Sequence, residues 1–394
     1  MALKNLQLKK SQERRLQVGH LWVYSNEVDV AKSPLKSFEP GELVNVVRVD
    51  GKSMGTAYIN PNTLISARII DDEPNVTPDA AWFERRILDA LALRSQYYQQ
   101  NCYRLIHSEG DYLPGVIIDR YGDYLVLQIN TQGMMAFRDT LVEVLQKVFQ
   151  PKGILLRNDN SARIHEGLEA ESEWLLGQGE STIIIENETR FEIPLGEGQK
   201  TGWFYDHREN RRSLQRIARD KHVLDVFSYM GGWGIAAAQA GAKSVCCVDS
   251  STTAIAYVHK NAELNNVQDR VETVCDDAFD ALKKLKAENR RFDIVVVDPP
   301  AFIKRKKDKE AGEKAYQQLN NLAMDLIVPG GMLISASCSH HLEEESLQRI
   351  ILRAARRQRR RLQILSRGDQ APDHPVHPAI AETRYIKTIF CRVI

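Results

Sequence analysis

The second half of the chain alternates short apolar runs with stretches of helical spacing, and this alternation constrains the fold more than any other feature. Helical stretches such as residues 251–265 separate the apolar runs. Strands that alternate with helices are typical of a doubly wound, largely parallel sheet. We therefore predict an α/β domain over residues 191–394. Its five strands are predicted near residues 222–227, 244–248, 271–274, 292–297 and 332–337.

The first 72 residues contain several short segments of β character. The apolar segments 43–49 and 64–70 are two of them, and the pair Asp50-Gly51 directly after the first is a hairpin signal. The sequence therefore predicts a small β domain over residues 1–72.

The next part of the chain, residues 73–190, mixes helical and strand signals. Thr77 is the expected cap of a helix that has Pro78 at its first position and runs to about Tyr98. A hairpin is predicted around Gly122, because apolar residues flank it on both sides. These signals predict a middle α+β domain, so that the chain has three domains in all.

Composition excludes several classes of protein. Lys and Arg total 53 against 52 for Asp and Glu, so the net charge identifies no partner. The start of the chain has no apolar signal core, and no apolar run reaches the roughly 18 residues that a membrane span needs, so we expect a cytoplasmic protein. The 6 cysteines form no Cys-x-x-Cys pair and no zinc spacing, and no metal is expected.

A glycine-containing turn follows the first predicted strand of the α/β domain. This strand leads through Ser228 and Tyr229 to Gly231 and Gly232, and a helix of small residues follows. Glycines let a ligand approach the backbone closely, and a helix N-terminus favours negative charge. The pattern predicts a nucleotide-type site at this turn.

Carboxylates end the first three strands of the same domain. Asp225 lies in the first strand, and Asp249 ends the second, where it is placed to hold ribose hydroxyls. Asp276 and Asp277 follow the third strand and are candidates to meet an adenine amino group. Their positions at successive strand ends favour a shared ligand over separate structural roles.

The residues of the turn distinguish between possible nucleotides. Phe227 and Tyr229 occupy the first two places of the glycine fingerprint of dinucleotide-binding enzymes, so the turn is not built for a pyrophosphate. An adenosine without phosphates fits better, which points to S-adenosylmethionine. An NAD-type enzyme is the alternative.

Two reactive side chains follow later strands. Asp298 begins the sequence Asp-Pro-Pro, and Cys338 lies among serines after the last predicted strand. Carbon 5 of a pyrimidine is a poor nucleophile, and addition of a thiolate at carbon 6 turns the ring into an enamine that can attack a methyl sulfonium. A carboxylate near ring nitrogen 3 helps by hydrogen bonding and proton supply. For Cys338 the alternative is a small buried hydrophobic residue, which we predict for Cys246 and Cys247.

These motifs together resemble the bacterial 23S ribosomal RNA large-subunit methyltransferase I family, which are cytosine-C5 enzymes. The resemblance covers nearly the whole chain. It is carried by residues 19–28, 103–106, 111–120, 198–208 and 225–232, by Asp298-Pro299-Pro300 and by Ser337-Cys338-Ser339.

The resemblance implies a fold and a substrate. Residues 1–72 are expected to form an RNA-binding PUA domain, a β-barrel, and residues 191–394 a Rossmann-like methyltransferase domain. The expected cofactor is S-adenosylmethionine, and the expected partner is 23S ribosomal RNA, naked or in an assembling particle, with a homodimer also allowed. The segment 198–208 borders the cofactor in the family. The residues implied at the cofactor are Thr201, Phe204, Asp206, Asp225, Phe227, Ser228, Tyr229, Gly231, Gly232, Asp249, Asp276 and Asp277.

One position departs from many RNA cytosine-C5 enzymes. These carry a second cysteine directly after the two prolines, where this chain has Ala301, as expected of a single-cysteine family. The acceptor of the C5 proton is therefore not identified by the sequence. Phe302, the next residue, is a candidate to stack on the target base, or else is a packed turn residue.

Basic residues gather at two places. Lys304, Arg305, Lys306 and Lys307 directly follow the Asp-Pro-Pro turn and are expected to hold phosphates. A late helix carries a second group, and either group can instead be solvated surface. That group contains Arg353, Arg356, Arg357, Arg359, Arg360 and Arg361.

Two other functions compete with cytosine methylation. Related RNA enzymes that methylate guanine N7 also use Asp-Pro-Pro followed by an aromatic residue, but that chemistry gives Cys338 no role. An RNA-binding assembly factor without turnover is the second rival, and the strand-end carboxylates together with Cys338 argue against it.

Overall fold

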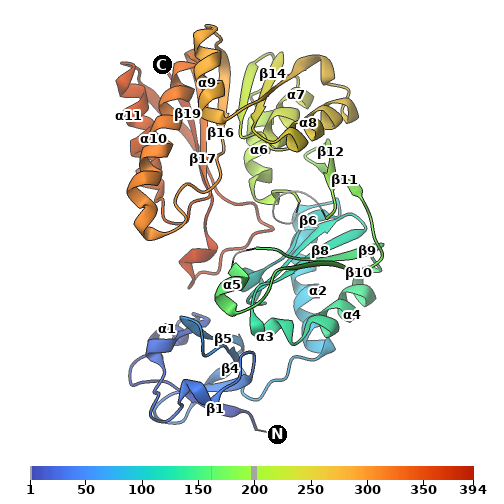
Figure 1. The fold of residues 1–394 in the computed structure, drawn as a ribbon, viewed down its shortest axis with the longest axis vertical. Helices are drawn as coiled ribbons and strands as arrows, with labels where there is room; N and C mark the ends of the chain where they lie inside the picture. Colours follow the sequence, from blue (N-terminus) through green and yellow to red (C-terminus); the bar gives the residue numbers. More distant parts are fainter. Residues whose placement is uncertain (1, 161, 197–201) are drawn as a thin grey trace. The chain divides into compact units, whose positions relative to one another are not determined.

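The structure, a computed structural model, describes residues 2–160, 162–196 and 202–394 (Figure 1). The chain forms two compact units. The first comprises Met1–Thr182, Pro194–Trp203 and Pro372–Thr383, and the second Ile183–Ile193, Phe204–Ala371 and Arg384–Ile394. This grouping is coarser than the three domains expected from the sequence, and the division at residues 72 and 190 stays a proposal.

The first sheet of the first unit has five strands in the order β1-β3-β4-β5-β2. Strand β1 pairs parallel with β3, and the other pairs are antiparallel. The hairpin predicted at Gly51 joins β3 to β4, and Gly51 adopts a positive φ of 81° there. The elements of this part are β1 (Lys4–Gln7), α1 (Arg14–Gln17), β2 (Trp22–Tyr24), β3 (Leu43–Val47), β4 (Ser53–Ile59) and β5 (Ile65–Asp71).

The second sheet of this unit has the order β10-β9-β8-β7-β6. Its β7–β8 hairpin confirms the prediction around Gly122. The long helix α2 packs against α4 and β6. The elements are α2 (Ala80–Tyr97), β6 (Cys102–His107), β7 (Val116–Tyr121), β8 (Tyr124–Ile129), α3 (Gln132–Met135), α4 (Arg138–Phe149), β9 (Gly153–Asn158), α5 (Ala162–Glu166) and β10 (Glu171–Leu176).

The start of α2 differs from the prediction. Asp79 caps the helix, and its carboxylate accepts a hydrogen bond from the backbone N–H of Trp82 at 2.8 Å. Thr77 and Pro78 therefore lie before the helix. A carboxylate is a good N-cap acceptor and also complements the positive end of the helix, so Asp79 replaces Thr77 in this role.

The second unit contains a seven-stranded sheet in the order β15-β14-β13-β16-β17-β19-β18. Strands β13 to β17 are parallel, and β19 pairs antiparallel with both β17 and β18. The predicted doubly wound sheet is confirmed. The strands are β13 (His222–Val226), β14 (Ser244–Asp249), β15 (Val271–Cys275), β16 (Phe292–Val297), β17 (Ile327–Ser337), β18 (Leu362–Gly368) and β19 (Lys387–Val393). A separate pair consists of β11 (Ser181–Glu186) and β12 (Thr189–Pro194).

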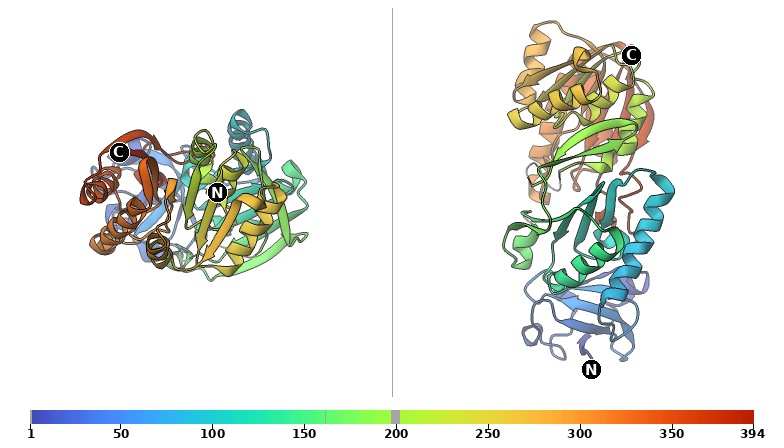
Figure 2. Two further views of the ribbon diagram at one scale, coloured as in Figure 1. Left: turned by 90° about the horizontal axis from the view of Figure 1, so that it is seen from above. Right: turned by 90° about the vertical axis from the view of Figure 1, so that its right-hand side faces the viewer.

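Strand order reverses at β13, which has β14 on one side and β16 on the other. In open α/β sheets the crevice outside the carboxyl ends of the strands at such a reversal is the usual ligand site. Helices α6, α7 and α8 lie on one side of the sheet, and α9, α10 and α11 on the other (Figure 1, Figure 2). They are α6 (Arg208–Gln215), α7 (Gly232–Gln239), α8 (Thr252–Leu264), α9 (Ala278–Ala287), α10 (Lys309–Asp325) and α11 (Glu344–Arg357).

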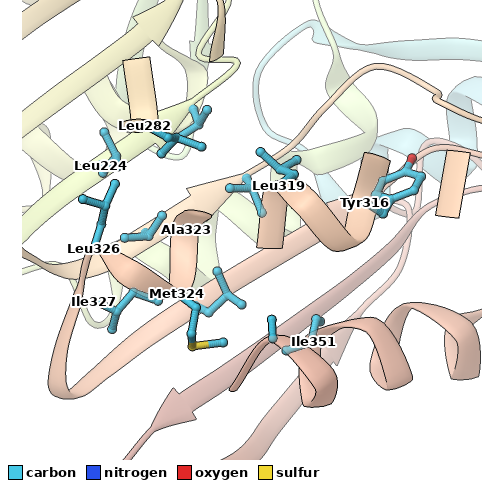
Figure 3. Packing of buried hydrophobic residues seen from close by; sticks show 14 of the residues in the cluster. Leu224, Leu282, Tyr316, Leu319, Ala323, Met324, Leu326, Ile327 and Ile351 are labelled. Carbon is cyan, nitrogen blue, oxygen red and sulfur yellow. The ribbon is translucent and has the colours of Figure 1, made fainter. Parts of the chain in front are cut away.

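Apolar side chains from this sheet and from α9, α10 and α11 form one core cluster (Figure 3). Leu224, Leu282 and Leu319 are fully buried within it. Cys246 and Cys247 are also buried, as predicted. Within the described residues, no helix has the length and apolar character to cross a membrane.

Candidate active site

The turn after β13 holds two L-residues in the left-handed region of backbone space. Phe227 has a φ of 64° and Tyr229 a φ of 50°, and Gly231 follows with 83°. Such a conformation costs a non-glycine residue roughly 1–3 kcal/mol and persists where the surroundings impose it. The Asp249 carboxylate supplies part of that constraint, since its Oδ2 accepts a hydrogen bond from the backbone N–H of Tyr229 at 2.8 Å. Strain of this kind clusters at ligand-binding sites.

Two buried polar atoms at this turn lack a partner within the described part of the chain. Asp225 Oδ2 accepts a hydrogen bond from the Gly234 N–H at 2.8 Å, but Asp225 Oδ1 and Ser228 Oγ form no hydrogen bond with these residues. Burial raises the pKa of Asp225 to about 7, although the hydrogen bond from the Gly234 N–H acts to lower it. Buried polar groups are normally satisfied. Their position at the strand-order reversal therefore fits a polar ligand that completes their hydrogen bonds.

The carboxylates at the ends of β14 and β15 have distinct local roles. The backbone N–H of Asp276 donates to the carbonyl of Asp249 at 3.1 Å, which joins the two strand ends. Asp276 also pairs with Lys284, and the hydrogen bond from Lys284 lowers the pKa of Asp276. Asp277 is exposed and caps α9, where its Oδ1 accepts two backbone N–H groups of the first turn. Asp249 therefore shapes the turn, while Asp277 starts a helix.

The segment before α6 brings two further predicted residues to the same unit. The Phe204 ring lies 5.3 Å from the Tyr229 ring, centroid to centroid, at an angle of 76°. Asp206 is buried, and its Oδ2 accepts a hydrogen bond from the Tyr385 hydroxyl at 2.7 Å. Phe204 is thereby placed beside the strained turn. Thr201 lies outside the described residues.

Asp298, after β16, is fixed by two side chains from other segments. His207 Nε2 lies 3.3 Å from Asp298 Oδ1, and Trp233 Nε1 donates to Oδ2 at 3.0 Å. Burial acts to raise the pKa of Asp298, but the charge and hydrogen bond of His207 and the bond from Trp233 hold it below its usual value. Burial likewise acts to lower the pKa of His207, and Asp298 outweighs it and raises that pKa. Both pKa shifts favour an ion pair between the buried His207 and the partly buried Asp298.

Cys338 comes directly after β17, which runs beside β16. Its Sγ lies 4.0 Å from the carbonyl oxygen of Pro299, so the structure brings the thiol to the Asp-Pro-Pro turn. Cys338 is partly exposed, whereas Ser337 and Ser339 on either side are fully buried. The hydroxyl of Tyr316 bonds to both serines at 2.8 and 2.9 Å. The residues on either side of Cys338 are therefore held in place, while Cys338 itself is partly exposed.

A buried lysine also contacts the segment around Cys338. Lys387 begins β19 and pairs in register with Ser337 of β17. Its Nζ donates to the carbonyl of Ser339 at 2.8 Å and to that of Tyr385 at 3.2 Å. Burial lowers the pKa of Lys387, although the charge of Cys338 acts to raise it. Tyr316 and Lys387 therefore both hold the residues next to Cys338 in the chain.

Sequence reasoning assigned no role to His207, Trp233 or Lys387. His207 and Trp233 lie in motifs that it recognised, directly after Asp206 and Gly232. The signal for Lys387 is a charged residue within the largely apolar segment 386–391. Such a position is unusual, because lysine is rarely buried without a partner.

Phe302 packs among other aromatic rings. Its centroid lies 4.8 Å from that of Tyr316 and 6.3 Å from those of Phe227 and Phe279. The ring is partly buried against the core cluster. These contacts favour the packed turn residue, and stacking of Phe302 on a base stays a proposal.

The two basic groups differ in how they are used. Lys304, Arg305, Lys306 and Lys307 are all exposed, and only Arg305 of these forms an ion pair within the described ranges, with Asp308 at 3.1 Å. On α11 and the residues after it, Arg360 donates to three main-chain carbonyls of β17 and β19 and so acts in the fold. The other arginines of that group are exposed. These are Arg353, Arg356, Arg357, Arg359 and Arg361.

The site thus combines a strained nucleotide-type turn with a carboxylate and a thiol at neighbouring strand ends. Comparison with known proteins also points to a methyltransferase. A family model for S-adenosylmethionine-dependent methyltransferases matches residues 161–388, and one for PUA-like domains matches residues 6–72. Among the described residues, no cluster of histidine, cysteine and carboxylate side chains has the geometry to hold a metal ion.

Curated relatives align over the whole chain. Ribosomal RNA large subunit methyltransferase I of Cronobacter sakazakii is 35% identical, with 99% of each chain covered. The protein of the same name from Shewanella denitrificans is 36% identical, with 98% of this chain and 99% of that one covered. A candidate S-adenosylmethionine-dependent methyltransferase from Streptococcus mutans has the same fold, with a TM-score of 0.83 at 22% identity over 99% of this chain and 100% of that one. The chain therefore belongs to the ribosomal RNA large subunit methyltransferase I family of S-adenosylmethionine-dependent enzymes.

Proposed function

We propose that this protein methylates carbon 5 of a cytosine in 23S ribosomal RNA, with Cys338 as the nucleophile. The observation that carries the proposal is the 4.0 Å approach of Cys338 Sγ to the turn that begins with Asp298. A methyltransferase that acts on a nucleophilic nitrogen such as guanine N7 needs no thiol at this place. A partly accessible cysteine beside a fixed carboxylate suits addition to a pyrimidine ring.

The residues around the turn after β13 are proposed to hold the cofactor. The unsatisfied Asp225 Oδ1 and Ser228 Oγ fit its polar groups, and Asp249 has lone pairs left for ribose hydroxyls. Phe204 and Tyr229 offer aromatic surface beside them. The cofactor supplies one chemical function, an electrophilic methyl group on a sulfonium. The other proposed contacts are Thr201, Asp206, Phe227, Gly231, Gly232, Asp276 and Asp277.

The reaction proceeds in two stages at the cytosine. The Cys338 thiolate adds to carbon 6, a C–S bond forms, and the electrons of the C5–C6 double bond make carbon 5 nucleophilic. Carbon 5 would then attack the methyl group, and the bond between that methyl group and the sulfonium sulfur would break with its electron pair left on the sulfur. In the second stage carbon 5 gives up its proton to a base, the electrons of that C–H bond restore the double bond, and the C–S bond breaks to release the thiolate.

Asp298 is proposed to orient the ring. Each carboxylate oxygen accepts more than one hydrogen bond, so after the contacts of His207 and Trp233 both oxygens retain lone pairs for the exocyclic amine. The neighbouring His207 cation makes a proton available near ring nitrogen 3, where negative charge develops during thiolate addition. The sequence predicted that Asp298 alone supplies hydrogen bonds and a proton to the ring. We propose that His207 shares this role.

The RNA substrate is proposed to contact several parts of the chain. The PUA-like residues 6–72 are of an RNA-binding type, and the exposed residues 304–307 offer positive charge beside the catalytic turn. Because thiolate attack needs an open ring face, the target cytosine must be flipped out or single-stranded. The substrate is naked 23S ribosomal RNA or an assembling large-subunit particle, and a homodimer and a cytoplasmic location belong to the same proposal.

Trapping with 5-fluorocytosine tests this function. RNA with 5-fluorocytosine at the target should form a covalent complex with the protein, because fluorine cannot leave as a proton does and the C–S bond persists. Cys338→Ala should give no adduct and no methylation, yet bind the cofactor as before. Cys246→Ala, a buried cysteine of β14, is the matched control and should still form the adduct.

The outcomes separate the alternatives. Full methylation by Cys338→Ala would reject the C5 mechanism and favour a guanine N7 product, which mass spectrometry of the RNA identifies. RNA binding without any methyl transfer by the unaltered protein would instead favour an assembly factor.

A further inference from the structure

Lys387 is a buried lysine whose ammonium bonds to main-chain carbonyls. Its relative exposure is 7%, and within the described residues no carboxylate forms an ion pair with its Nζ. Both of its hydrogen bonds go to main-chain carbonyls, at Ser339 and Tyr385. An ammonium has three donors, so one N–H remains after these two bonds. A lysine in such a setting is costly unless something compensates its charge.

The thiol of Cys338 is a group whose negative charge acts to favour the ammonium form of Lys387. Lys387 pairs in register with Ser337 and bonds to Ser339, the residues on either side of Cys338. Other charges act on Lys387 from neighbouring elements: Arg384 opposes its protonation, and Asp369 and Glu344 favour it. Asp369 and Glu344 both pair with Arg384 and are thereby engaged elsewhere.

Charge compensation between these groups has a chemical consequence. The thiolate, and not the thiol, attacks carbon 6, and a nearby cation favours the thiolate. The same cation also favours release of the thiolate when the C–S bond breaks.

We propose that Lys387 is a positioning residue that favours the thiolate form of Cys338. The inference rests on the proposed function, since it gives Lys387 a role in the reaction only if Cys338 is the nucleophile. The proton of the thiol passes to solvent, and the Lys387 ammonium keeps its three protons throughout. Lys387 therefore forms no bond with the substrate.

Alkylation of the whole protein by iodoacetamide, without RNA or cofactor, tests the proposal. The rate at Cys338 is measured over a pH series by mass spectrometry of its peptide, and the exposed Cys275 in the same sample gives an internal reference. We expect half-maximal reactivity of Cys338 at a lower pH than that of Cys275. Lys387→Gln retains donors for the two carbonyls but removes the charge, and should raise the Cys338 midpoint by about 1–3 pH units. The Cys275 midpoint should not move.

Two further variants complete the design. Lys387→Arg keeps the charge, so the midpoint of Cys338 alkylation should stay close to that of the unaltered protein. Arg360→Met removes another cation that bonds to main-chain carbonyls, although a less buried one, and should leave the Cys338 midpoint unchanged.

Two results would overturn the proposal. One is a folded Lys387→Gln protein with the Cys338 midpoint of the unaltered protein. The other needs no variant: a Cys338 midpoint at or above that of Cys275 in the unaltered protein. Neither result depends on methylation, so a failure of the proposed function, seen as full activity of Cys338→Ala, is distinguished from a failure of this inference.

Discussion

His207 Nε2 lies 3.3 Å from Asp298 Oδ1, and this contact joins a segment before α6 to the end of β16. The His207 side chain is almost fully enclosed, and the indole of Trp233 bonds to the other carboxylate oxygen. A carboxylate held from two sides cannot rotate freely. Asp298 is therefore preorganised for a ligand, because its direction and ionisation are set before any ligand arrives.

The first prediction concerns the stability that this pair contributes. The pKa of His207 is raised in the fold, so its contribution is complete below its unfolded value of about 6.5 and is lost as the pH rises through the folded value. The pKa of Asp298 is lowered, and its contribution is lost at acid pH. His207→Gln should cost roughly 2 kcal/mol of unfolding free energy near pH 6. Urea unfolding over a pH series should show this difference shrinking above neutral pH.

The control for this variant is His259→Gln. His259 is an exposed histidine of α8 whose described partner is the hydroxyl of Thr273, not a carboxylate. Its substitution should change stability little at any pH. A His207→Gln difference that stays constant with pH would show that folding does not shift the pKa of His207, and would contradict the ion pair with Asp298.

The second prediction concerns Asp225, whose pKa burial raises to about 7. A carboxyl with a raised folded pKa binds a proton on folding, so stability falls as the pH rises from about 4 to about 7. Asp225→Asn keeps an acceptor for the Gly234 N–H and removes the charge. At pH 8 the variant should have a free energy of unfolding up to about 4 kcal/mol higher than that of the unaltered protein. At pH 4 the two proteins should be equally stable. Parallel urea curves at these two pH values check the sign, and equal stability at pH 8 would contradict a buried ionised Asp225.

The third prediction concerns the cofactor. Asp249→Ala should weaken S-adenosylmethionine binding by roughly 1.5–3 kcal/mol, measured by calorimetry, because it removes a charged hydrogen-bond acceptor and releases the Tyr229 N–H. Asp280→Ala is the matched control, since Asp280 is an exposed carboxylate of α9 that pairs with Lys283. Unchanged affinity in a folded Asp249→Ala protein would remove Asp249 from the site.

The fold was predictable because strands and helices leave local signals. The apolar run 292–297 is the strand Phe292–Val297, and the helix predicted over residues 251–265 is Thr252–Leu264, capped by Ser251. Local signals also misplaced one strand boundary. Strand β17 begins at Ile327, earlier than predicted, because Pro329 and two glycines read as a turn in sequence but lie within the strand.

The site was predictable only in part, for a different reason. Asp298 and Cys338 stand at strand ends, where topology alone brings side chains to one edge of the sheet. His207 and Lys387 reach the site through packing of segments far apart in the chain. No periodicity or spacing relates residue 207 to residue 298, so only the three-dimensional structure reveals that pair.

The fourth prediction concerns RNA affinity. Changing Lys304, Arg305, Lys306 and Lys307 to Gln should weaken RNA binding, and the slope of log affinity against log salt should fall by about one unit for each phosphate that the protein no longer neutralises. Arg305 already pairs with Asp308, so it should contribute least. A filter-binding series over salt concentration measures the slope.

The matched control removes the same number of charges from α11 and the residues that follow its end. Arg353, Arg356, Arg357 and Arg359 are exposed like the loop residues but lie away from the Asp-Pro-Pro turn in sequence, and their change to Gln alters the total charge equally. If proximity to the catalytic turn matters, the loop variant should show a larger decrease in affinity and in salt dependence than the α11 variant. Equal decreases would mean that total charge governs binding, and an unaltered slope in the loop variant would leave residues 304–307 as ordinary solvated surface.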